Sequence, residues 1–385
     1  MSPRPAERMK EIPPSSTLRV LSLAKKLERE GRSILHLEVG EPDFDTPEHV
    51  KRAAWEALQK GMTKYTPSEG LPELREAVAE RVGAERENVL ITPGAKHAIF
   101  CAMEAILDPG EEVILPSPCW TYDGIVLSVG GKPVFLETRM EEGFRVDVER
   151  LEKALTPRTK LLVLNSPSNP TGAVLDEENL KAILDFARER DLWILTDEIY
   201  DRLVYEGKGT SLLSLAGSLE GIVYINGFSK TYAMTGWRLG YAVAPKELIA
   251  EMNKIQQAST SCVPGFVQMA GLEALRGPQD FVERMREEFR KRRDFMVKGL
   301  SSLGLKCLPP KGAFYLFPRL PEGWKDSTSF CEHLLREVGI ASVPGIGFGP
   351  FGEGHVRFSF ACSMEVLKET LQRLGEFLQH HHISG

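Results

Sequence analysis

The sequence has little of what several classes of protein require. Its six cysteines form no CxxC pair and no spacing typical of a metal site, so we expect reduced, mostly buried thiols and no bound metal. No run of 18 apolar residues is present, and the basic N-terminal segment has no apolar stretch behind it, so neither a membrane span nor a signal peptide is expected. A net charge of −6 provides no basic surface for nucleic acid or an anionic membrane. These absences favour a cytoplasmic protein whose partner is a small molecule.

The order of apolar segments indicates an α/β fold. Seven short apolar runs alternate with helical stretches, and the simplest interpretation is a mostly parallel, seven-stranded sheet. Runs that are apolar on both faces imply that helices cover both sides of the sheet. The runs comprise residues 88–91, 112–116, 132–137, 160–165, 192–196, 222–226 and 239–244.

The length and the later pattern predict two domains. A chain of 385 residues exceeds the roughly 250 to 300 residues at which single cores stop growing. We expect residues 44–284 to form the large domain, and residues 12–43 together with 285–385 to form a smaller α+β domain. The charged segment 278–300 is typical of a long helix that links the two.

The start of one helix and the C-terminal tail of the chain carry specific expectations. Thr46 and Pro47 are predicted to be the N-cap and first residue of a helix that stops at Gly61. The C-terminal HHHISG, residues 380–385, is either native or an added tag, and we expect it to be disordered rather than to ligate a metal.

Polar side chains follow three of the predicted strands. Asn169 lies in SPSNPTG after one strand, Asp197 in TDEIY after the next, and Lys230 in FSKTY after a third. Sheets of this type bind ligands beyond the carboxyl ends of their strands. An amide, a carboxylate and an amine are therefore expected at one edge of the sheet.

The stretch NGFSKTYAMTGWRLGY, residues 226–241, places Lys230 and Arg238 among apolar side chains without an acidic partner. A lysine whose charge is suppressed is a nucleophile toward a carbonyl group and can form a Schiff base. Lowering its pKa from about 10.4 to near 7 takes roughly 4 kcal/mol, which burial and a neighbouring cation could supply. The alternative is a lysine whose stem lies along the surface, and the local sequence does not separate the two.

Nearby residues suggest what such a lysine would meet. Gly94 and Ala95 are expected at a helix start, where free backbone N–H groups favour a phosphate. Arg238 could bind the same phosphate through bidentate hydrogen bonds from its guanidinium. A buried Asp197 is costly without a cation, and a pyridinium nitrogen would be such a cation.

Six segments together resemble one enzyme family. SKTYAMTGWR, SPSNPTG, TDEIY, VGEPDF, KYTPSEGLPELR and GHVRFSF are similar to those of the class I/II aminotransferases, pyridoxal-phosphate enzymes of the aspartate aminotransferase fold, called fold type I. The resemblance runs from about residue 12 to 378 in the family's order and spacing. It implies an enzyme that moves an amino group between an L-amino acid and a 2-oxo acid. It also implies a homodimer with shared active sites.

The resemblance assigns roles around the cofactor ring. Lys230 matches the Schiff-base lysine, which also moves the substrate proton, and Asp197 matches the residue that keeps the pyridine nitrogen protonated. Tyr200 and Asn169 match the donors to the phenolic oxygen of the ring, and Trp120 matches the aromatic side chain stacked on it. Taken singly, Trp120 and Tyr200 could equally be packing residues.

The resemblance also assigns the phosphate and the substrate carboxylate. Arg357, helped by Gly40, matches the arginine that binds the α-carboxylate, although on its own it could be a strand residue facing solvent. The phosphate cup is matched by Gly94, Ala95, Lys96, Ser229 and Arg238, and by Tyr65 from a second subunit.

Substrate preference depends on two weaker matches. Lys96 and Thr17 fall where the prokaryotic aspartate aminotransferase subgroup binds the distal carboxylate of aspartate or glutamate. Ala95 and His97 depart from that subgroup's pattern in the same loop, and Lys96 could instead be a surface lysine. We therefore expect L-aspartate with 2-oxoglutarate as substrates, which corresponds to aspartate transaminase, EC 2.6.1.1.

Other functions stay open at this point. Aromatic, alanine or prephenate aminotransferase activity would use the same residues, as would a carbon–sulfur lyase or an aminocyclopropane-carboxylate synthase. A cofactor-binding transcriptional regulator ranks last, because no helix-turn-helix extension or basic patch is visible.

Overall fold

The predicted seven-stranded sheet is present. The computed structural model describes residues 3–14, 16–207, 209–324 and 326–382. The strand order is β2-β8-β7-β6-β5-β3-β4, in which β8 runs antiparallel to β2 and β7 and the remaining neighbours are parallel. The strands are β2 (Val89–Thr92), β3 (Glu112–Ser117), β4 (Lys132–Glu137), β5 (Thr159–Asn165), β6 (Trp193–Asp197), β7 (Ile222–Gly227) and β8 (Gly240–Val243).

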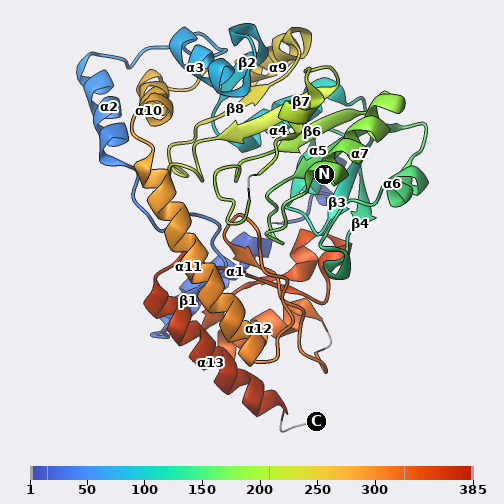
Figure 1. Ribbon diagram of the computed structural model, residues 1–385, viewed down its shortest axis with the longest axis vertical. Coiled ribbons are helices and arrows are strands. Elements are labelled where there is room, and N and C mark those ends of the chain that lie inside the picture. Colours follow the sequence, from blue (N-terminus) through green and yellow to red (C-terminus); the bar gives the residue numbers. More distant parts are fainter. Residues whose placement is uncertain (1–2, 15, 208, 325, 383–385) are drawn as a thin grey trace.

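Helices cover both faces of the sheet, as the two-faced apolar runs require. In β3, Val113 and Leu115 pack with the core beneath α4, α5 and α9, whereas Ile114 between them packs with the core beneath α6 and α7. Successive side chains of a strand point to opposite faces, so these strands are buried on both. The helices of this large domain surround the sheet in Figure 1: α2 (Glu48–Gln59), α3 (Pro72–Val82), α4 (Ala95–Ile106), α5 (Tyr122–Ser128), α6 (Val148–Ala154), α7 (Glu177–Glu189), α8 (Leu212–Ala216), α9 (Lys246–Ser259) and α10 (Gly265–Arg276).

The predicted cap of α2 is wrong. The helix begins at Glu48 with Pro47 as its N-cap, and no side chain caps it. The hydroxyl of Thr46 instead donates to the carbonyl of Ala233 and accepts a hydrogen bond from the indole of Trp237. A partner distant in sequence has therefore taken the side chain that local preference assigns to the helix.

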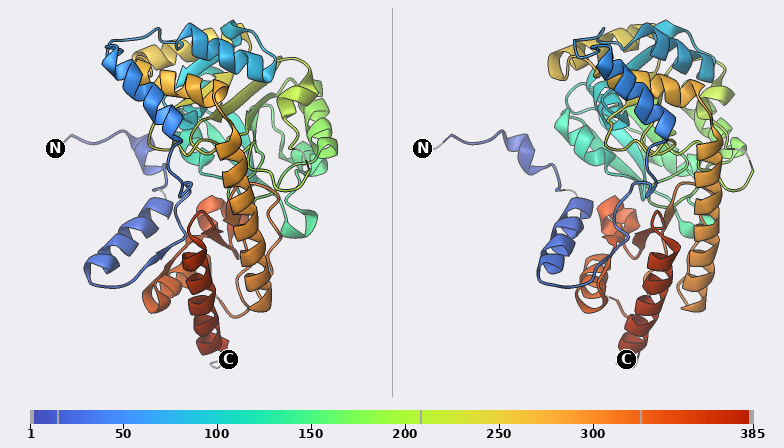
Figure 2. Two further views of the ribbon diagram at one scale, coloured as in Figure 1. Left: turned by 60° about the vertical axis from the view of Figure 1, so that its left-hand side comes forward. Right: turned by 90° about the vertical axis from the view of Figure 1, so that its left-hand side faces the viewer.

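A smaller set of strands and helices lies below the large domain in Figure 1. Here β1 pairs in parallel with β10, and β12 pairs in antiparallel fashion with β11 and β9. In Figure 2, α1 lies beside this part of the molecule, and the N-terminal end of the chain projects outwards. The elements are α1 (Ser16–Arg29), β1 (Leu35–His36), α11 (Asp280–Ser302), β9 (Tyr315–Leu316), α12 (Ser327–Val338), β10 (Ile340–Ala341), β11 (Val343–Pro344), β12 (Val356–Ser359) and α13 (Met364–His382).

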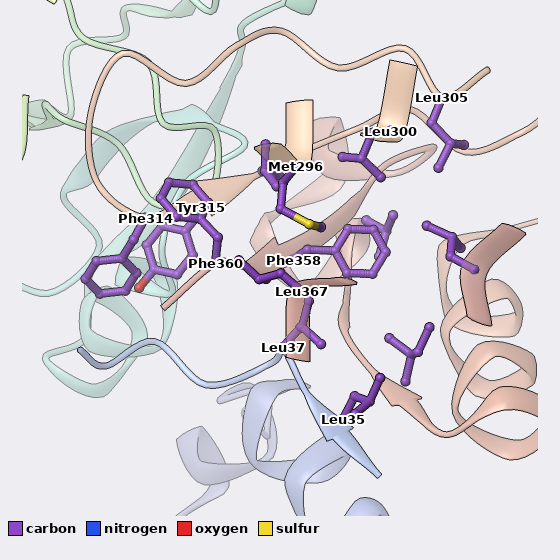
Figure 3. Packing of buried hydrophobic residues seen from close by; sticks show 14 of the residues in the cluster. Leu35, Leu37, Met296, Leu300, Leu305, Phe314, Tyr315, Phe358, Phe360 and Leu367 are labelled. Carbon is purple, nitrogen blue, oxygen red and sulfur yellow. The ribbon is translucent and has the colours of Figure 1, made fainter. Parts of the chain in front are cut away.

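The long helix α11 connects the two parts. It runs from the large domain down to the small domain in Figure 1, so the predicted boundary at residue 284 lies within a continuous helix. Met296 and Leu300 of α11 pack with Leu35 and Leu37 from the N-terminal segment and with Phe358 of β12, as Figure 3 shows. The N-terminal segment thus shares the core of the C-terminal strands. The exact boundaries at 44 and 284 stay a prediction.

The expected disorder of the histidine tail is wrong for its first residues. α13 continues to His382, and residues 383–385 lie outside the described residues. Nε2 of His381 hydrogen-bonds a carboxylate oxygen of Glu337 at 3.1 Å, and the His381 ring lies 5.0 Å from that of Trp324 and 4.5 Å from that of Phe377. These contacts hold the last turn of the helix.

Short 3-10 helices complete the fold. No described helix is both long enough and apolar enough to cross a membrane. Within the same residues, no group of three or more His, Cys, Asp and Glu side chains could hold a metal ion. The 3-10 helices are η1 (Glu7–Lys10), η2 (Arg86–Asn88), η3 (Met140–Glu142), η4 (Gly345–Phe348) and η5 (Pro350–Gly352).

Candidate active site

The polar residues at the strand ends come together with an arginine from the small domain. Asp197 is the last residue of β6, whereas Asn169 and Lys230 lie in the loops that follow β5 and β7. Arg357 of β12 donates from Nη1 to Oδ1 of Asn169 at 2.9 Å. The predicted edge of the sheet is therefore also the place where the two domains meet.

Lys230 is held in a largely buried position. Its Nζ donates to the carbonyl oxygen of Gly40 at 2.5 Å. Burial, with Arg357 and Arg238 nearby, lowers the pKa of Lys230 to about 8, against the opposing charges of Glu41 and Asp197. At mildly alkaline pH a substantial fraction of this lysine is neutral, and the neutral amine is the form that attacks a carbonyl carbon.

Asp197 has a partner that the sequence did not reveal. The carboxylate is buried, its Oδ2 accepts from the hydroxyl of Tyr122 at 2.7 Å, and its Oδ1 accepts from the backbone N–H of Ile199 at 3.2 Å. Burial raises the pKa of Asp197 to about 6, although both hydrogen bonds lower it. Tyr122 therefore helps to keep a buried carboxylate ionised near neutral pH. Its position two residues after Trp120, in the first turn of α5, was the only available signal.

Arg357 is a buried cation, and one of its N–H donors is unpaired among the described residues. It is 2% exposed, and its Nη2 donates to the backbone carbonyl of Glu38 at 2.5 Å. Its guanidinium lies 4.5 Å from the centre of the Tyr315 ring and 5.0 Å from that of the Phe348 ring. Among the described residues its Nε has no hydrogen-bond partner, and burial lowers the pKa of Arg357. An unpaired buried donor of this kind suits a carboxylate ligand.

The start of α4 forms a cradle for an anion. Gly94 is the N-cap, with φ of 85°, and a Cβ there would lie 2.4 Å from Nη2 of Arg238. A Cβ at Gly240 would lie 2.3 Å from the backbone nitrogen of Ala95. The first N–H groups of a helix lack acceptors within it and carry the positive end of its dipole. Of the predicted phosphate residues, Gly94 and Arg238 therefore lie together, and Ser229 is buried in the loop that precedes Arg238.

The two residues predicted to select the substrate, Lys96 and Thr17, lie on different helices, α4 and α1. Nζ of Lys96 lies 4.8 Å from the centre of the Trp120 ring, and the Trp120 ring meets that of Tyr122 edge-on at 5.1 Å. Thr17 lies in the first turn of α1, which packs on β10 and β11. No hydrogen bond between described residues joins it to Lys96 or to the arginine of β12. The structure thus places Lys96 against Trp120, and the role of Thr17 stays a prediction.

Two tyrosines complete the description. Tyr200 is buried, and its hydroxyl lies 2.8 Å from that of Tyr315, a residue that the sequence did not single out. Tyr65 is 90% exposed between α2 and α3. An aromatic side chain with so little cover in its own chain is available to another molecule.

Taken together, these residues define a class of enzyme. A nucleophilic lysine, a buried carboxylate, a helix start suited to phosphate and a buried arginine can serve Schiff-base chemistry on a carboxylate-bearing substrate.

The family model described as aminotransferase class I and II matches residues 32–374. The chain therefore belongs to the class I and II aminotransferases. It is 46% identical to the aspartate/prephenate aminotransferase of Thermus thermophilus, covering 97% of this chain and 98% of that protein. It is 43% identical to aromatic-amino-acid aminotransferase 2 of Thermococcus litoralis, over 97% and 98% of the two chains.

Solved structures agree with this family and with the fold. The aspartate aminotransferase of Thermus thermophilus with maleate superposes with a TM-score of 0.94, is 45% identical, and covers 97% of this chain and 100% of its own. The aromatic aminotransferase of Pyrococcus horikoshii has a TM-score of 0.89 at 42% identity, covering 94% and 99% of the two chains. The predicted fold type is confirmed.

Proposed function

We propose that this aminotransferase transfers the amino group of L-aspartate to 2-oxoglutarate, using pyridoxal 5'-phosphate. The observation that carries the proposal is the convergence of Lys230, Asp197 and Arg357 from separate elements on one place. The pKa of Lys230, lowered to about 8 by burial, suits an amine that must react with an aldehyde.

The residues present fit this cofactor. The cradle at Gly94 and Arg238, where a Cβ would collide with the guanidinium, suits its phosphate. Asp197, buried and without a cation in direct contact among the described residues, suits its ring nitrogen, and Asn169 and Tyr200 would donate to its phenolic oxygen. When bound, the cofactor supplies an electron sink for the bonds at the substrate α-carbon.

The protein's own groups account for the remaining steps. Arg357 holds the substrate α-carboxylate through its free donor, which fixes the α-carbon near Lys230. With the cofactor bound, Nζ of Lys230 would be the base that takes the proton from the substrate α-carbon and the acid that gives a proton back. Asp197 stays ionised with the help of Tyr122 and keeps the ring nitrogen protonated.

The acidic substrate preference rests on Lys96. Its ammonium stands over the ring of Trp120, 4.8 Å from the ring centre. Burial, with Arg238 nearby, lowers the pKa of Lys96, and a substrate carboxylate would offset that cost. A solved relative is described with maleate, a dicarboxylate, which supports the same preference.

Aromatic and prephenate activity form the second candidate. The names of two relatives, an aspartate/prephenate and an aromatic-amino-acid aminotransferase, favour it. The aromatic face of Trp120 beneath Lys96 offers a surface for a ring as well as for a carboxylate chain.

We further propose that the enzyme is a cytoplasmic homodimer with shared active sites. Tyr65, 90% exposed in one chain, would complete the phosphate cup of the partner chain. All six cysteines are free thiols, which supports a reducing compartment.

A panel of amino donors and oxo acids tests the substrate, and Lys96→Ala sharpens it. We expect the variant to lose about tenfold to a hundredfold in kcat/KM for aspartate and glutamate, while alanine and phenylalanine are spared. Lys298→Ala, at an exposed lysine of α11, is the matched control. Equal losses for every substrate would refute the role of Lys96.

The lysine itself tests the reaction class. Lys230→Ala should abolish transamination and the pH-sensitive visible absorbance of the cofactor-loaded protein, and persistence of that band would contradict the assignment. Ammonia and pyruvate released without any need for an oxo acid would instead reveal a lyase.

A further inference from the structure

Tyr315 touches several parts of the proposed site at once. Its hydroxyl lies 2.8 Å from that of Tyr200, and its ring supports the guanidinium of Arg357 at 4.5 Å. A Cβ built at Gly40 would lie 2.6 Å from the same hydroxyl oxygen. In Figure 3 the ring lies at the margin of the small-domain core, with its oxygen turned away from the aliphatic side chains.

The ring of Tyr315 is firmly held. It is fully buried, and its centroid lies 4.8 Å from that of Phe314. The ring of Phe348 also lies close to Arg357, at 5.0 Å. The guanidinium therefore contacts two rings that belong to the small domain, and the attraction between a cation and an aromatic face is stronger when the cation is desolvated.

The direction of the hydrogen bond between the hydroxyls of Tyr315 and Tyr200 matters for a ligand of Tyr200. A phenol donates a single hydrogen and accepts at its lone pairs. If Tyr200 is to donate to a ligand, its oxygen must accept from Tyr315 rather than donate to it. A Tyr315 hydroxyl that donates leaves the Tyr200 hydrogen free for the ligand and also polarises the Tyr200 O–H, which makes it a stronger donor. Phenylalanine at position 315 would remove that polarisation.

We propose that Tyr315 is a positioning residue for transamination, through its ring under Arg357 and its hydroxyl on Tyr200. It sets the carboxylate-binding group and the donor to the cofactor's phenolic oxygen in one geometry across the two domains. Position 40 is glycine because this hydroxyl fills the space that a side chain would need. The inference rests on the proposed function.

Two substitutions separate the ring from the hydroxyl. Tyr315→Phe keeps the ring, so we expect maleate, a non-reacting dicarboxylate probe, to bind the cofactor-loaded protein within about twofold of wild type. The pH at which the visible band changes should rise by about 0.5 to 1 unit, the size expected for one lost neutral hydrogen bond. Tyr315→Leu removes the ring as well, and maleate binding should weaken by about 3- to 30-fold.

Gly40→Ala provides an independent test, because the hydroxyl decides whether a methyl group fits. In the wild-type background the methyl meets the oxygen at 2.6 Å, and we expect the band to shift as in Tyr315→Phe. In the Tyr315→Phe background its nearest neighbour is the ring carbon Cζ at 3.5 Å, an ordinary contact, so the added change should be small. The two substitutions should therefore be strongly non-additive.

The outcomes distinguish this inference from the proposed function. An unchanged band midpoint in Tyr315→Phe, or equal losses from Gly40→Ala in both backgrounds, would overturn the role of Tyr315. Wild-type protein that shows the band and binds maleate but transfers no amino group would refute transamination alone. Calorimetry with maleate and the pH titration of the band read the positions of Arg357 and Tyr200 without turnover.

Discussion

Replacing Lys230 by methionine should change the stability of the cofactor-free protein in a pH-dependent way. The wild-type lysine has a folded pKa of about 8, against a reference value of 10.5, because burial disfavours its charge. At about 1.4 kcal/mol for each pH unit, this difference corresponds to about 3 kcal/mol. The unfolded chain binds more protons than the folded one between these two values, so wild-type stability gains this amount as pH rises from about 8 to 10.5. A methionine, which does not titrate, lacks the gain.

Denaturant unfolding at a fixed protein concentration measures this effect. Between pH 7 and pH 9.5 the stability of wild type relative to Lys230→Met should rise by about 2 kcal/mol, the part of the gain completed by the higher pH. Lys298→Met, at an exposed lysine of α11, is the matched control. A difference between wild type and Lys230→Met that is the same at both pH values would refute a charge suppressed by burial.

Three further predictions concern binding and assembly. Arg357→Ala should cost about 2 to 5 kcal/mol, seen as a raised KM for every amino acid, and an effect confined to acidic substrates would contradict its role. Tyr122→Phe should raise the pKa of Asp197 above its present value of about 6 and weaken pyridoxal-phosphate binding, more at pH 6.5 than at pH 8.5, in a titration followed by tryptophan fluorescence. A pH-independent loss would show a purely structural role. Mixing Tyr65→Ala with Lys230→Ala subunits should restore about a quarter of wild-type activity, because each mixed dimer holds one intact site. Mixtures no more active than their components would place Tyr65 in its own subunit's site.

The central sheet could be read from the sequence because its strands are apolar on both faces. Segments such as 160–165 and 222–226 leave few alternatives to a covered parallel sheet, and the topology brings their carboxyl ends to one edge. Asn169, Asp197 and Lys230 were therefore found from order alone.

Where a prediction from the sequence was wrong, a partner distant in the chain had overridden a local preference. Thr46 looks like a helix cap but bonds to Ala233 and Trp237, far along the chain. The histidine tail looks disordered, yet His381 packs on Trp324.

The sequence by itself determined the two-faced strands, their order and the polar residues that follow them, because these properties depend on neighbours along the chain. Only the tertiary structure decided which side chains support those residues. Tyr122 reaches Asp197, and Tyr315 reaches Tyr200 and Arg357, from elements 75 and 115 residues away from Asp197 and Tyr200 in the chain. The first contact arises only when α5 packs on the central sheet, and the contact of Tyr315 with Tyr200 arises only when the two domains pack. No local pattern encodes which buried side chain a buried tyrosine will meet.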